Sequence, residues 1–434
     1  MNESDSPLLD AVADLVRQKP ARFFMPGHKG NPAAMPLFGG VFPFDITEVE
    51  GADNLMRPTG PIAQSEANMT RVYGSGATLY SASGSTSCIL AMLAVFTRPG
   101  QTVAMARGCH AAAVRALVLL DLTPAWLLPQ GPQPTPAEAE ALLKRSGARV
   151  LYLTSPNYYG QMADIAGIAA VCREHEAVLL VDNAHGAHLR FLKKDCHPLS
   201  LGADAACDSA HKTLPCLTPA AMLHLKNAER AYHAREMLNL FSSTSPSYLV
   251  LQSLDWAACV LMKKTLEFEK TAVRFSAACG DSRHLIQKSD DPLKMCFVPA
   301  RGGWKAKEME MAFAQAGIVP ELADGRHIVL MASPYNTEEE FDRLHASLCA
   351  FTCREPLPLP SVSLALPRVA CGVREAFFAK KEQIEAEKCA GRVAAGVVAP
   401  CPPGVPLAVP GEVLEQEVAD LLVAGGILTL DVLK

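Results

Sequence analysis

Lys212 and Asp182 are residues of the two types that a pyridoxal phosphate site needs. A lysine amine can form a Schiff base with the cofactor aldehyde, and a carboxylate at a strand end can keep the pyridine nitrogen protonated. Asp182 directly follows the apolar run 177–181, which is typical of a buried parallel strand. Doubly wound sheets bind ligands at the carboxyl ends of such strands. The two residues together predict a pyridoxal phosphate site.

Each of these residues also has an ordinary explanation when it is taken alone. The chain has 40 Lys and Arg residues, and most lysines are solvated surface groups. An aspartate after a strand is as often the N-cap of the next helix. The functional interpretation therefore depends on the further residues that accompany the pair.

A segment rich in serine, 80–87, could bind a phosphate. It precedes an apolar helix predicted at 88–93, where backbone N–H groups and hydroxyls would meet at the helix N-terminus. Such residues are more often plain helix caps, and the segment has neither a Walker lysine nor a GxGxxG pattern. A nucleotide site is therefore not expected.

Three histidines follow predicted strand ends. His110 comes after the strand predicted at 103–105, so its imidazole could stack on a cofactor ring, although a lone histidine usually has no such role. His185 and His188 follow Asp182 and could be zinc ligands. No third ligand is evident, and the 14 cysteines are scattered singly. We therefore expect no metal.

Composition indicates an ordinary globular protein with a small-molecule substrate. The chain has 434 residues, of which 49% are hydrophobic and 20% charged, with a net charge of -5. This balance favours neither nucleic acid nor an anionic membrane surface. The N-terminus is acidic and polar, and no apolar run is long enough for a membrane helix. The dispersed cysteines suit a reducing cytosol, so we expect a cytoplasmic protein.

The order of predicted elements indicates an α/β protein. Short apolar runs alternate with helical patterns over 62–225, which predicts a mainly parallel sheet. A helix is expected to begin at Thr135-Pro136, residues 227–270 read as mostly helical with a polar break at 242–247, and Thr337 is expected to cap a helix after a strand at 328–331. The proline-rich stretch 354–367 reads as an extended connection. The expected domains are an N-terminal arm (1–60), a cofactor-binding large domain (61–275) and a small C-terminal domain (276–434).

Many segments, in order along the chain, resemble the prokaryotic ornithine/lysine/arginine decarboxylase family. The resemblance covers most of the chain, and so many ordered matches make it specific. The matching segments are 25–30 (Met-Pro-Gly-His-Lys-Gly), 45–48, 83–86, 154–160 (Thr-Ser-Pro-Asn-Tyr-Tyr-Gly), 182–188, 209–217, 244–248, 402–406 and 410–412.

The resemblance implies a fold and a set of cofactor contacts. The fold is that of aspartate aminotransferase (fold type I), with a mainly parallel seven-stranded sheet in the large domain and a smaller α+β C-terminal domain. By resemblance, Lys212 is the Schiff-base lysine, Asp182 pairs with the pyridinium nitrogen, and His110 stacks on one ring face with Ala184 on the other. His185 lies near the phenolic oxygen or the substrate carboxylate. The implied phosphate ligands are Gly84, Ser85, Thr86, Ser209 and His211.

The same resemblance implies an obligate dimer whose sites are built from two subunits. Thr244 or Ser245 would then serve the cofactor of the partner, and His28 would also lie close to the site. The chain begins at the catalytic part, without the N-terminal wing domain of the large family members. We therefore expect a homodimer or a dimer of dimers rather than a decamer.

Four departures from the family pattern bear on substrate choice. Asn183 replaces the usual Glu, Ala111-Ala112 replaces Lys-Ser after His110, Gly396 replaces a common Glu, and Cys401 replaces Tyr before Pro-Pro-Gly. The cofactor residues are thus retained while their surroundings differ.

The leading hypothesis is decarboxylation of arginine, lysine or ornithine to the amine and carbon dioxide. Substrate would displace Lys212, and Lys212 or a nearby histidine would return a proton to Cα. The candidate acids for the distal cation are Glu48, Glu321, Asp324 and Glu412, each of which could equally be surface charge. Two alternatives stay open: another pyridoxal phosphate reaction, such as transamination or elimination, and a catalytically silent paralogue that regulates polyamine metabolism.

Overall fold

The computed structural model describes residues 4–264, 266–359, 365–399 and 404–434. Two compact units make up the chain, and each is described by itself. The first unit comprises Met1–Thr97, Val178–Arg190 and Lys194–Leu266, and the second comprises Arg98–Ala177, Phe191–Lys193 and Glu267–Lys434.

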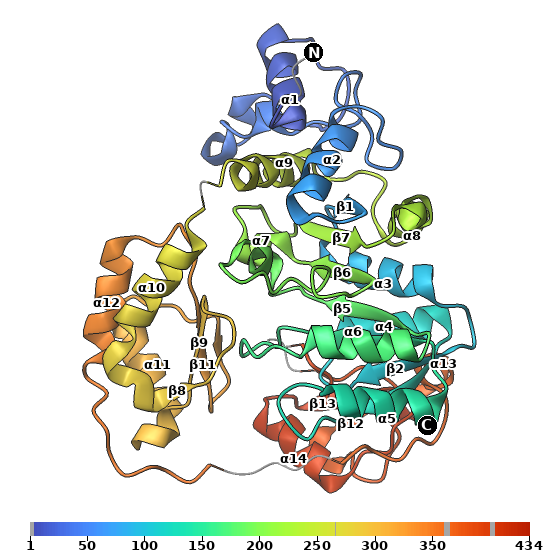
Figure 1. Cartoon of the computed structure of the whole chain (residues 1–434), viewed down its shortest axis with the longest axis vertical. Coiled ribbons are helices and arrows are strands. Elements are labelled where there is room, and N and C mark those ends of the chain that lie inside the picture. The colour runs from blue at the N-terminus through green and yellow to red at the C-terminus, as the bar shows by residue number, and fades with distance from the viewer. Residues whose placement is uncertain (1–3, 265, 360–364, 400–403) are drawn as a thin grey trace. The chain divides into compact units, whose positions relative to one another are not determined.

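A seven-stranded sheet has the order β1-β7-β6-β5-β4-β2-β3 (Figure 1). Strand β2 is parallel to β3 and β4, and β5 is parallel to β6, whereas β7 runs antiparallel to both β1 and β6. The predicted α/β fold with a mainly parallel seven-stranded sheet is therefore confirmed. The strands are β1 (Ala77–Ser81), β2 (Thr102–Ala106), β3 (Thr123–Leu127), β4 (Val150–Thr154), β5 (Val178–Asp182), β6 (Ala205–Asp208) and β7 (Ala221–Leu225).

Helices of the first unit include α3, whose segment 88–93 is completely buried, as the unbroken apolar run predicts. Two helices flank the predicted polar break at 242–247, which is confirmed. The helices of this unit are α1 (Pro7–Gln18), α2 (Pro61–Tyr73), α3 (Gly84–Phe96), α7 (Ala210–Thr213), α8 (Ala231–Phe241) and α9 (Tyr248–Met262), with short 3₁₀ turns at Pro32–Ala34, Pro36–Phe38, Phe42–Phe44 and Ala228–Arg230.

In the second unit two predicted helix starts are confirmed by capping boxes. Thr135 caps α5 with Glu138, and Thr337 caps α12 with Glu340. The helices of this unit are α4 (Ala111–Leu120), α5 (Pro136–Ser146), α6 (Ile165–Glu174), α10 (Phe268–Ala278), α11 (Ala306–Gln315), α12 (Glu338–Leu348), α13 (Val373–Phe378) and α14 (Gln416–Ala424).

The C-terminal part contains two small antiparallel sheets, each with its own apolar core. One core gathers Phe297, Phe313 and Phe341, and the other gathers Leu414, Leu422 and Val432. The predicted smaller α+β part is therefore present. The two compact units divide the chain at other positions than the three predicted domains, whose bounds stay a prediction. The strands are β8 (Ile286–Gln287), β9 (Lys294–Phe297), β10 (Leu322–Ala323) and β11 (Ile328–Met331) in one sheet, and β12 (Lys381–Glu385) and β13 (Thr429–Leu433) in the other.

The extended connection predicted at 354–367 has no helix or strand in its described residues, 354–359 and 365–367. Residues 360–364 of that stretch lie outside the described part of the chain.

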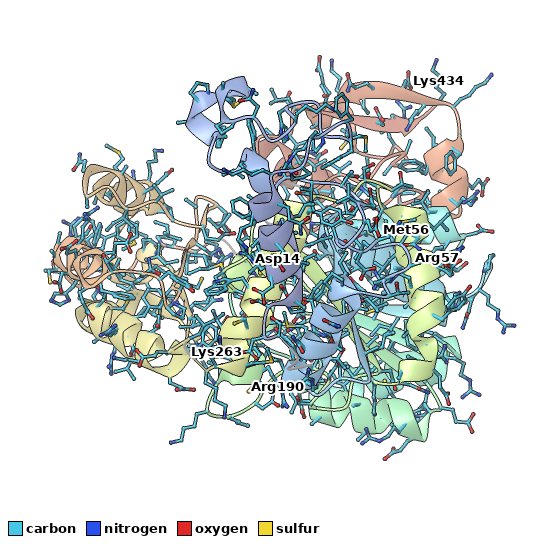
Figure 2. The ribbon with its side chains drawn as sticks, turned by 90° about the horizontal axis from the view of Figure 1, so that it is seen from above. Asp14, Met56, Arg57, Arg190, Lys263 and Lys434 are labelled. Carbon is cyan, nitrogen blue, oxygen red and sulfur yellow. The ribbon has the colours of Figure 1, made fainter. Side chains whose placement is uncertain are left out.

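A buried aspartate of α9 holds the start of α1. Asp255 Oδ2 accepts hydrogen bonds from the backbone N–H groups of Leu8 and Leu9, both at 2.9 Å. Lys263, the C-cap of α9 (labelled in Figure 2), forms an ion pair with Asp5 at 3.3 Å. Burial raises the pKa of Asp255 to about 6. Helix α1 is therefore held to α9 through a group that titrates in mildly acidic solution.

Replacement of Asp255 with Asn should change how stability depends on pH. The pKa of this carboxyl is about 6 in the folded state, above the value of about 4 in unfolded chains. Its contribution is therefore fully present below about pH 4 and is lost as pH rises toward about 6. Urea unfolding should show wild type losing about 2 kcal/mol relative to Asp255→Asn across that interval.

The exposed Asp342 offers a matched control for this measurement. Asp342→Asn should leave the pH profile of wild type unchanged. Parallel profiles for Asp255→Asn and wild type would contradict the assignment.

Candidate active site

Lys212 and His185 are in direct contact in the first unit. Lys212 lies on the short helix α7 after β6, and its Nζ is 2.9 Å from Nε2 of His185. His185 follows β5 and is buried, whereas Lys212 is exposed within this chain. The structure thus joins the predicted Schiff-base lysine to a predicted neighbour of the cofactor. An imidazole at this distance can exchange a proton with the amine.

Asp182 ends β5 and is only 1% exposed. Its Oδ1 accepts a hydrogen bond from Ala184 N–H at 3.1 Å and one from the Cys207 thiol at 3.7 Å. Burial and the charge of Asp182 raise the pKa of Cys207, which therefore stays a thiol and donates. These contacts fix the orientation of the carboxylate, as a partner for a pyridinium nitrogen requires.

The start of α3 forms a cradle of donors that an anion could occupy. Ser83, at the N-cap, makes no side-chain capping bond, so the first N–H groups of this helix are not satisfied in that way. Gly84 has a φ of +78°, a conformation that favours glycine. The Ser209 hydroxyl donates to Ser85 at 2.8 Å, which brings α7 to the same place. The predicted phosphate residues of α3 and Ser209 therefore do lie together.

His211 and Ala184 complete this set. His211 Nδ1 lies 2.8 Å from Ala220 O and donates to it, and burial lowers the pKa of the ring. The imidazole is therefore neutral, with Nε2 free of a proton. Ala184 is buried beside Asp182. An amine, an oriented carboxylate and an anion cradle in one unit fit pyridoxal phosphate.

His110 is the N-cap of α4 in the second unit. Its Nδ1 accepts a hydrogen bond from Ala112 N–H at 3.1 Å, so Nε2 carries the proton in the neutral ring. Gly404 packs against the ring, since a Cβ there would lie 2.8 Å from Nε2. Ala111 N–H donates to Gly404 O at 2.9 Å. The predicted strand-to-helix position of His110 is confirmed, and its stacking role stays a prediction.

The residues predicted to serve a partner's site lie elsewhere in the first unit. Thr244 and Ser245 are exposed between α8 and α9. His28 bonds Asp45 at 3.1 Å and stacks on Phe42, with ring centroids 4.3 Å apart. Their roles stay predictions.

Three of the four departures lie among the described residues. Ala111-Ala112 begins α4, Asn183 is fully buried, and a Cβ on Gly396 would lie 3.7 Å from Cβ of Asp431. Cys401 lies outside the described residues.

The four acids proposed for the distal cation differ in what already binds them. Glu412 forms a bidentate ion pair with Arg107, with both N···O distances 2.8 Å and the Glu412 side chain only 3% exposed. Glu48 accepts from the adjacent Thr47 hydroxyl. Glu412 is therefore a structural residue, paired with Arg107, rather than a ligand of the distal cation.

Glu321 and Asp324 lie beside the tyrosines of the Pro-Asn-Tyr-Tyr-Gly motif. The Tyr158 hydroxyl donates to Glu321 at 2.5 Å, and the Tyr159 hydroxyl donates to Asp324 at 3.2 Å. Asp324 also accepts from His327 at 3.0 Å. Burial alone would raise the pKa of Asp324, but hydrogen bonds from the His327 side chain and from the backbone N–H groups of His327 and Arg326 outweigh it and hold the pKa at about 2. Asp324 is therefore negative at neutral pH, and both acids are exposed.

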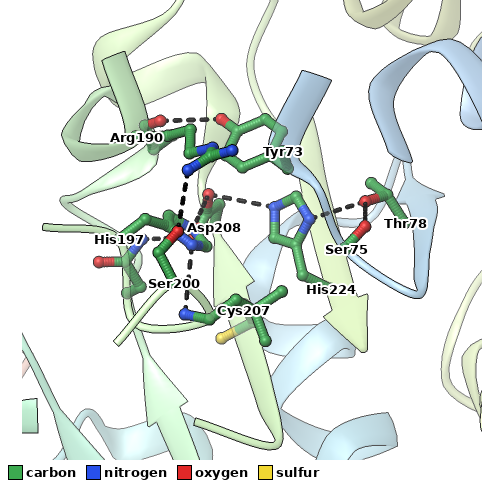
Figure 3. Close-up of polar contacts among 12 residues, drawn as sticks. Tyr73, Ser75, Thr78, Arg190, His197, Ser200, Cys207, Asp208 and His224 are labelled. Carbon is green, nitrogen blue, oxygen red and sulfur yellow. Dashed lines mark hydrogen bonds and ion pairs between the residues drawn. The ribbon is translucent and has the colours of Figure 1, made fainter. Parts of the chain in front are cut away.

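Sequence reasoning missed a buried cluster formed by His197, Asp208 and His224 (Figure 3). Each imidazole Nε2 lies 3.2 Å from Asp208 Oδ2. A histidine at the centre of the apolar run 221–225 was the signal that could have found it, since such a residue needs a buried partner. The three ligand atoms lie within 4.8 Å and could hold a metal ion, a site different from the zinc pair considered above. Hydrogen bonds account for all three without an ion.

Glu412→Gln should destabilise the second unit rather than alter substrate choice. Loss of the carboxylate leaves the largely buried Arg107 guanidinium without its counter-charge, which costs about 3 kcal/mol. The midpoint of urea unfolding should fall accordingly. Glu176→Gln is the control, since its ion pair with Arg149 is exposed and contributes less than about 1 kcal/mol. Equal effects of the two substitutions would contradict this assignment.

Two family models match the chain over most of its length. The model described as Orn/Lys/Arg decarboxylase, major domain, matches residues 6–293, and the model described as Orn/Lys/Arg decarboxylase, C-terminal domain, matches residues 365–424.

Among curated proteins, YaaO of Bacillus subtilis is 30% identical over 95% of this chain and 92% of its own length. The arginine decarboxylase of Bacillus subtilis is 25% identical over 96% of this chain and 93% of its own length.

Solved structures show the same fold. The lysine decarboxylase LdcF of Francisella novicida has a TM-score of 0.83 at 16% identity, covering 99% of this chain and 81% of its own. An aspartate aminotransferase of Thermus thermophilus has a TM-score of 0.54 at 17% identity, covering 67% of this chain and 90% of its own. The expected aspartate aminotransferase fold is confirmed. Among the described helices, none has the length and apolar character needed to cross a membrane.

Proposed function

Because the chain belongs to the Orn/Lys/Arg decarboxylase family and is an amino-acid decarboxylase, we propose that it uses pyridoxal phosphate to decarboxylate arginine, lysine or ornithine. The contact of Lys212 with His185, beside the oriented carboxylate of Asp182, is the observation that carries this proposal.

The cofactor, when bound, supplies a protonated ring that accepts the electron pair of the bond to the leaving carboxylate. Lys212 would hold it through the amine, and Asp182 would keep the ring nitrogen protonated. Ser85, Thr86, Ser209 and His211 would hold the phosphate, with Gly84 allowing its close approach. Ala184 would pack against one face of the ring.

His185 serves as the proton acceptor and donor for Lys212. The amine must be uncharged to act as a nucleophile, and His185 Nε2, 2.9 Å from Nζ, is placed to take its proton. The same proton can return to Nζ and from there to the substrate Cα. The burial of His185 keeps bulk water from competing for this exchange.

Glu321 and Asp324 are the proposed ligands of the distal cation. Their fixed hydroxyl partners, Tyr158 and Tyr159, hold the two carboxylates in place. Two negative groups select a substrate with a positive distal end. The naming of relatives as arginine or lysine decarboxylases agrees with such a substrate.

We further propose that the protein acts in the cytoplasm as a homodimer. All 13 described cysteines are free thiols, as a reducing compartment favours. Several apolar side chains of segment 23–41 are exposed in the single chain, Phe23 by 96% and Leu37 by 86%. A second subunit would cover such a surface, and Thr244 and Ser245 would then serve the partner's cofactor.

Lys212→Ala should abolish cofactor-dependent carbon dioxide release. Arginine, lysine and ornithine are supplied separately to purified protein with pyridoxal phosphate, and released gas and visible absorption are recorded. Wild type should release gas from one of the three, while Lys212→Ala should fall below roughly one thousandth of that rate and lose the Lys212-dependent absorption band. Lys226→Ala, at an exposed position, should behave as wild type.

Two other outcomes would redirect the assignment. A Lys212-dependent absorption band without gas from any of the three would favour another pyridoxal phosphate reaction, as the departures at Asn183, Ala112, Gly396 and Cys401 would allow. Failure to bind the cofactor at all would favour a silent regulatory paralogue.

Glu321→Gln should weaken substrate binding more than it slows turnover. Loss of one of the two negative charges should raise KM for the preferred amino acid by about tenfold, with kcat reduced less. Glu310→Gln, which alters an exposed ion pair with Lys307, is the control. An unchanged KM for Glu321→Gln would exclude this residue as a ligand of the distal cation.

A further inference from the structure

We propose that Asp208 is a positioning residue for the active site: its buried carboxylate, held by two histidines, fixes through Asn183 the turn that carries Asp182 and His185. This inference deepens the proposed function, on which it rests for the role of those two residues.

The carboxylate of Asp208 is enclosed by donors. Oδ1 accepts from Asn183 Nδ2 at 2.7 Å, and Oδ2 lies 3.2 Å from Nε2 of both His197 and His224. All four side chains are completely buried. A buried carboxylate is tolerated only with such partners, so these contacts hold it at one place.

The hydrogen-bond partner of Nδ1 determines which nitrogen of each imidazole carries the proton. His197 Nδ1 accepts from Leu199 N–H at 3.4 Å, so its Nε2 carries the proton and donates to Asp208. His224 Nδ1 lies 2.8 Å from the Thr78 hydroxyl, which can donate to it (Figure 3). Both rings can therefore donate from Nε2 while uncharged.

Charge at this cluster resides on Asp208. Burial lowers the pKa of His224, which keeps it neutral near pH 7. Burial alone would raise the pKa of Asp208, but the two imidazoles outweigh it and hold that pKa well below its ordinary value. The other charged or titratable groups on this face are Tyr73 of α2, whose pKa is raised by burial and by Asp208, and Arg190, which bonds Asp195 and Ser200. Asp182 and Cys207 lie on the opposite face of β5 and β6.

Asn183 links the Asp208 carboxylate to the active-site turn. Its N–H bonds Cys207 O at 2.9 Å, and its carbonyl accepts from Gly186 N–H at 2.8 Å. A Cβ on Gly186 would lie 2.1 Å from Asn183 Oδ1, so the side chain also packs against the turn. Asp182 precedes Asn183, and His185 lies within the same turn. Fixing the Asn183 amide therefore fixes both functional groups.

The pairing explains why position 183 is an amide in this chain. A carboxylate there would face the Asp208 carboxylate at 2.7 Å in a site without solvent. Ionisation of both groups at that distance is strongly unfavourable, so the pair is forced apart at high pH and shares a proton at lower pH. Asn183→Asp has the same shape as the native residue, so its effect isolates charge from packing.

The decisive experiment exchanges the two residues. Asn183→Asp, Asp208→Asn and the double variant are compared with wild type. In the double variant the amide at 208 donates to the carboxylate at 183, while its oxygen accepts from both histidines. Every hydrogen bond is thus preserved, and the single negative charge moves by one side chain.

Two measurements report on the turn. Hydrogen exchange of the apo protein follows the amides of Ala184 and Gly186, which bond Asp182 Oδ1 and Asn183 O. Binding of pyridoxal phosphate is measured separately. At about pH 8, these amides should exchange at least about tenfold faster in Asn183→Asp than in wild type, and its cofactor affinity should fall by at least about tenfold. In the double variant both quantities should return to within about threefold of wild type.

The charge conflict adds a signature that packing alone would not give. The defect of Asn183→Asp should shrink toward about pH 5, where the paired carboxylates share a proton, while wild type and the double variant lack this dependence. Ser65→Ala, which removes a buried hydrogen bond to Tyr80 in the same unit, is the matched control and should leave exchange at Ala184 and Gly186 unchanged.

Each remaining outcome counts against the proposal. Wild-type exchange in Asn183→Asp at all pH values, or a double variant whose defects are the sum of the two single defects, would overturn it. If Asn183→Asp does not fold, the proposal still requires the double variant to fold, and its failure to do so would overturn the proposal. A wild type that binds no pyridoxal phosphate would refute the proposed function, whereas the exchange measurement would still decide the role of Asp208.

Discussion

Two buried carboxylates at adjacent strand ends are the constraint on which this site depends. Asp182 ends β5 and Asp208 ends β6, and Asp182 is in register with Cys207. Since successive side chains of a strand point to opposite faces, the two acids lie on opposite faces of the sheet. Asp182 can therefore serve the cofactor on one face of the sheet, while Asp208 fixes the strand ends on the other face. Each charge has its own donors, which is what makes their burial tolerable.

A similar separation of tasks applies to the acids of the second unit. Glu412 is neutralised by Arg107 and stabilises the packing of the C-terminal segment, whereas Glu321 and Asp324 keep exposed carboxylate surface beside two tyrosines. Burial decides which acid is structural and which can meet a substrate.

Local patterns in the sequence were sufficient to predict the sheet and the positions of Asp182 and His110 after strands. The apolar run before Asp182, the small residues before α3 and the strand ahead of His110 each reflect short-range rules, and the family resemblance joined them. The Asp208 cluster was beyond such rules, because Asn183 follows β5, His197 lies in the loop before β6 and His224 lies within β7. The commitment of Glu412 to Arg107, 305 positions away, depends on tertiary packing that no spacing pattern records.

The contact of Gly404 with His110 has an evolutionary consequence. The N-cap of α4 is completed by a C-terminal residue whose carbonyl accepts from Ala111 N–H and whose Cα abuts the imidazole. Arg374 of α13 likewise donates to Val118 O at the end of the same helix. The C-terminal region is thus part of the wall around a candidate catalytic histidine. The C-terminal region is therefore not an independent module. A recombinant protein that combines segments of two relatives must take α4 and the segment around Gly404 from the same relative.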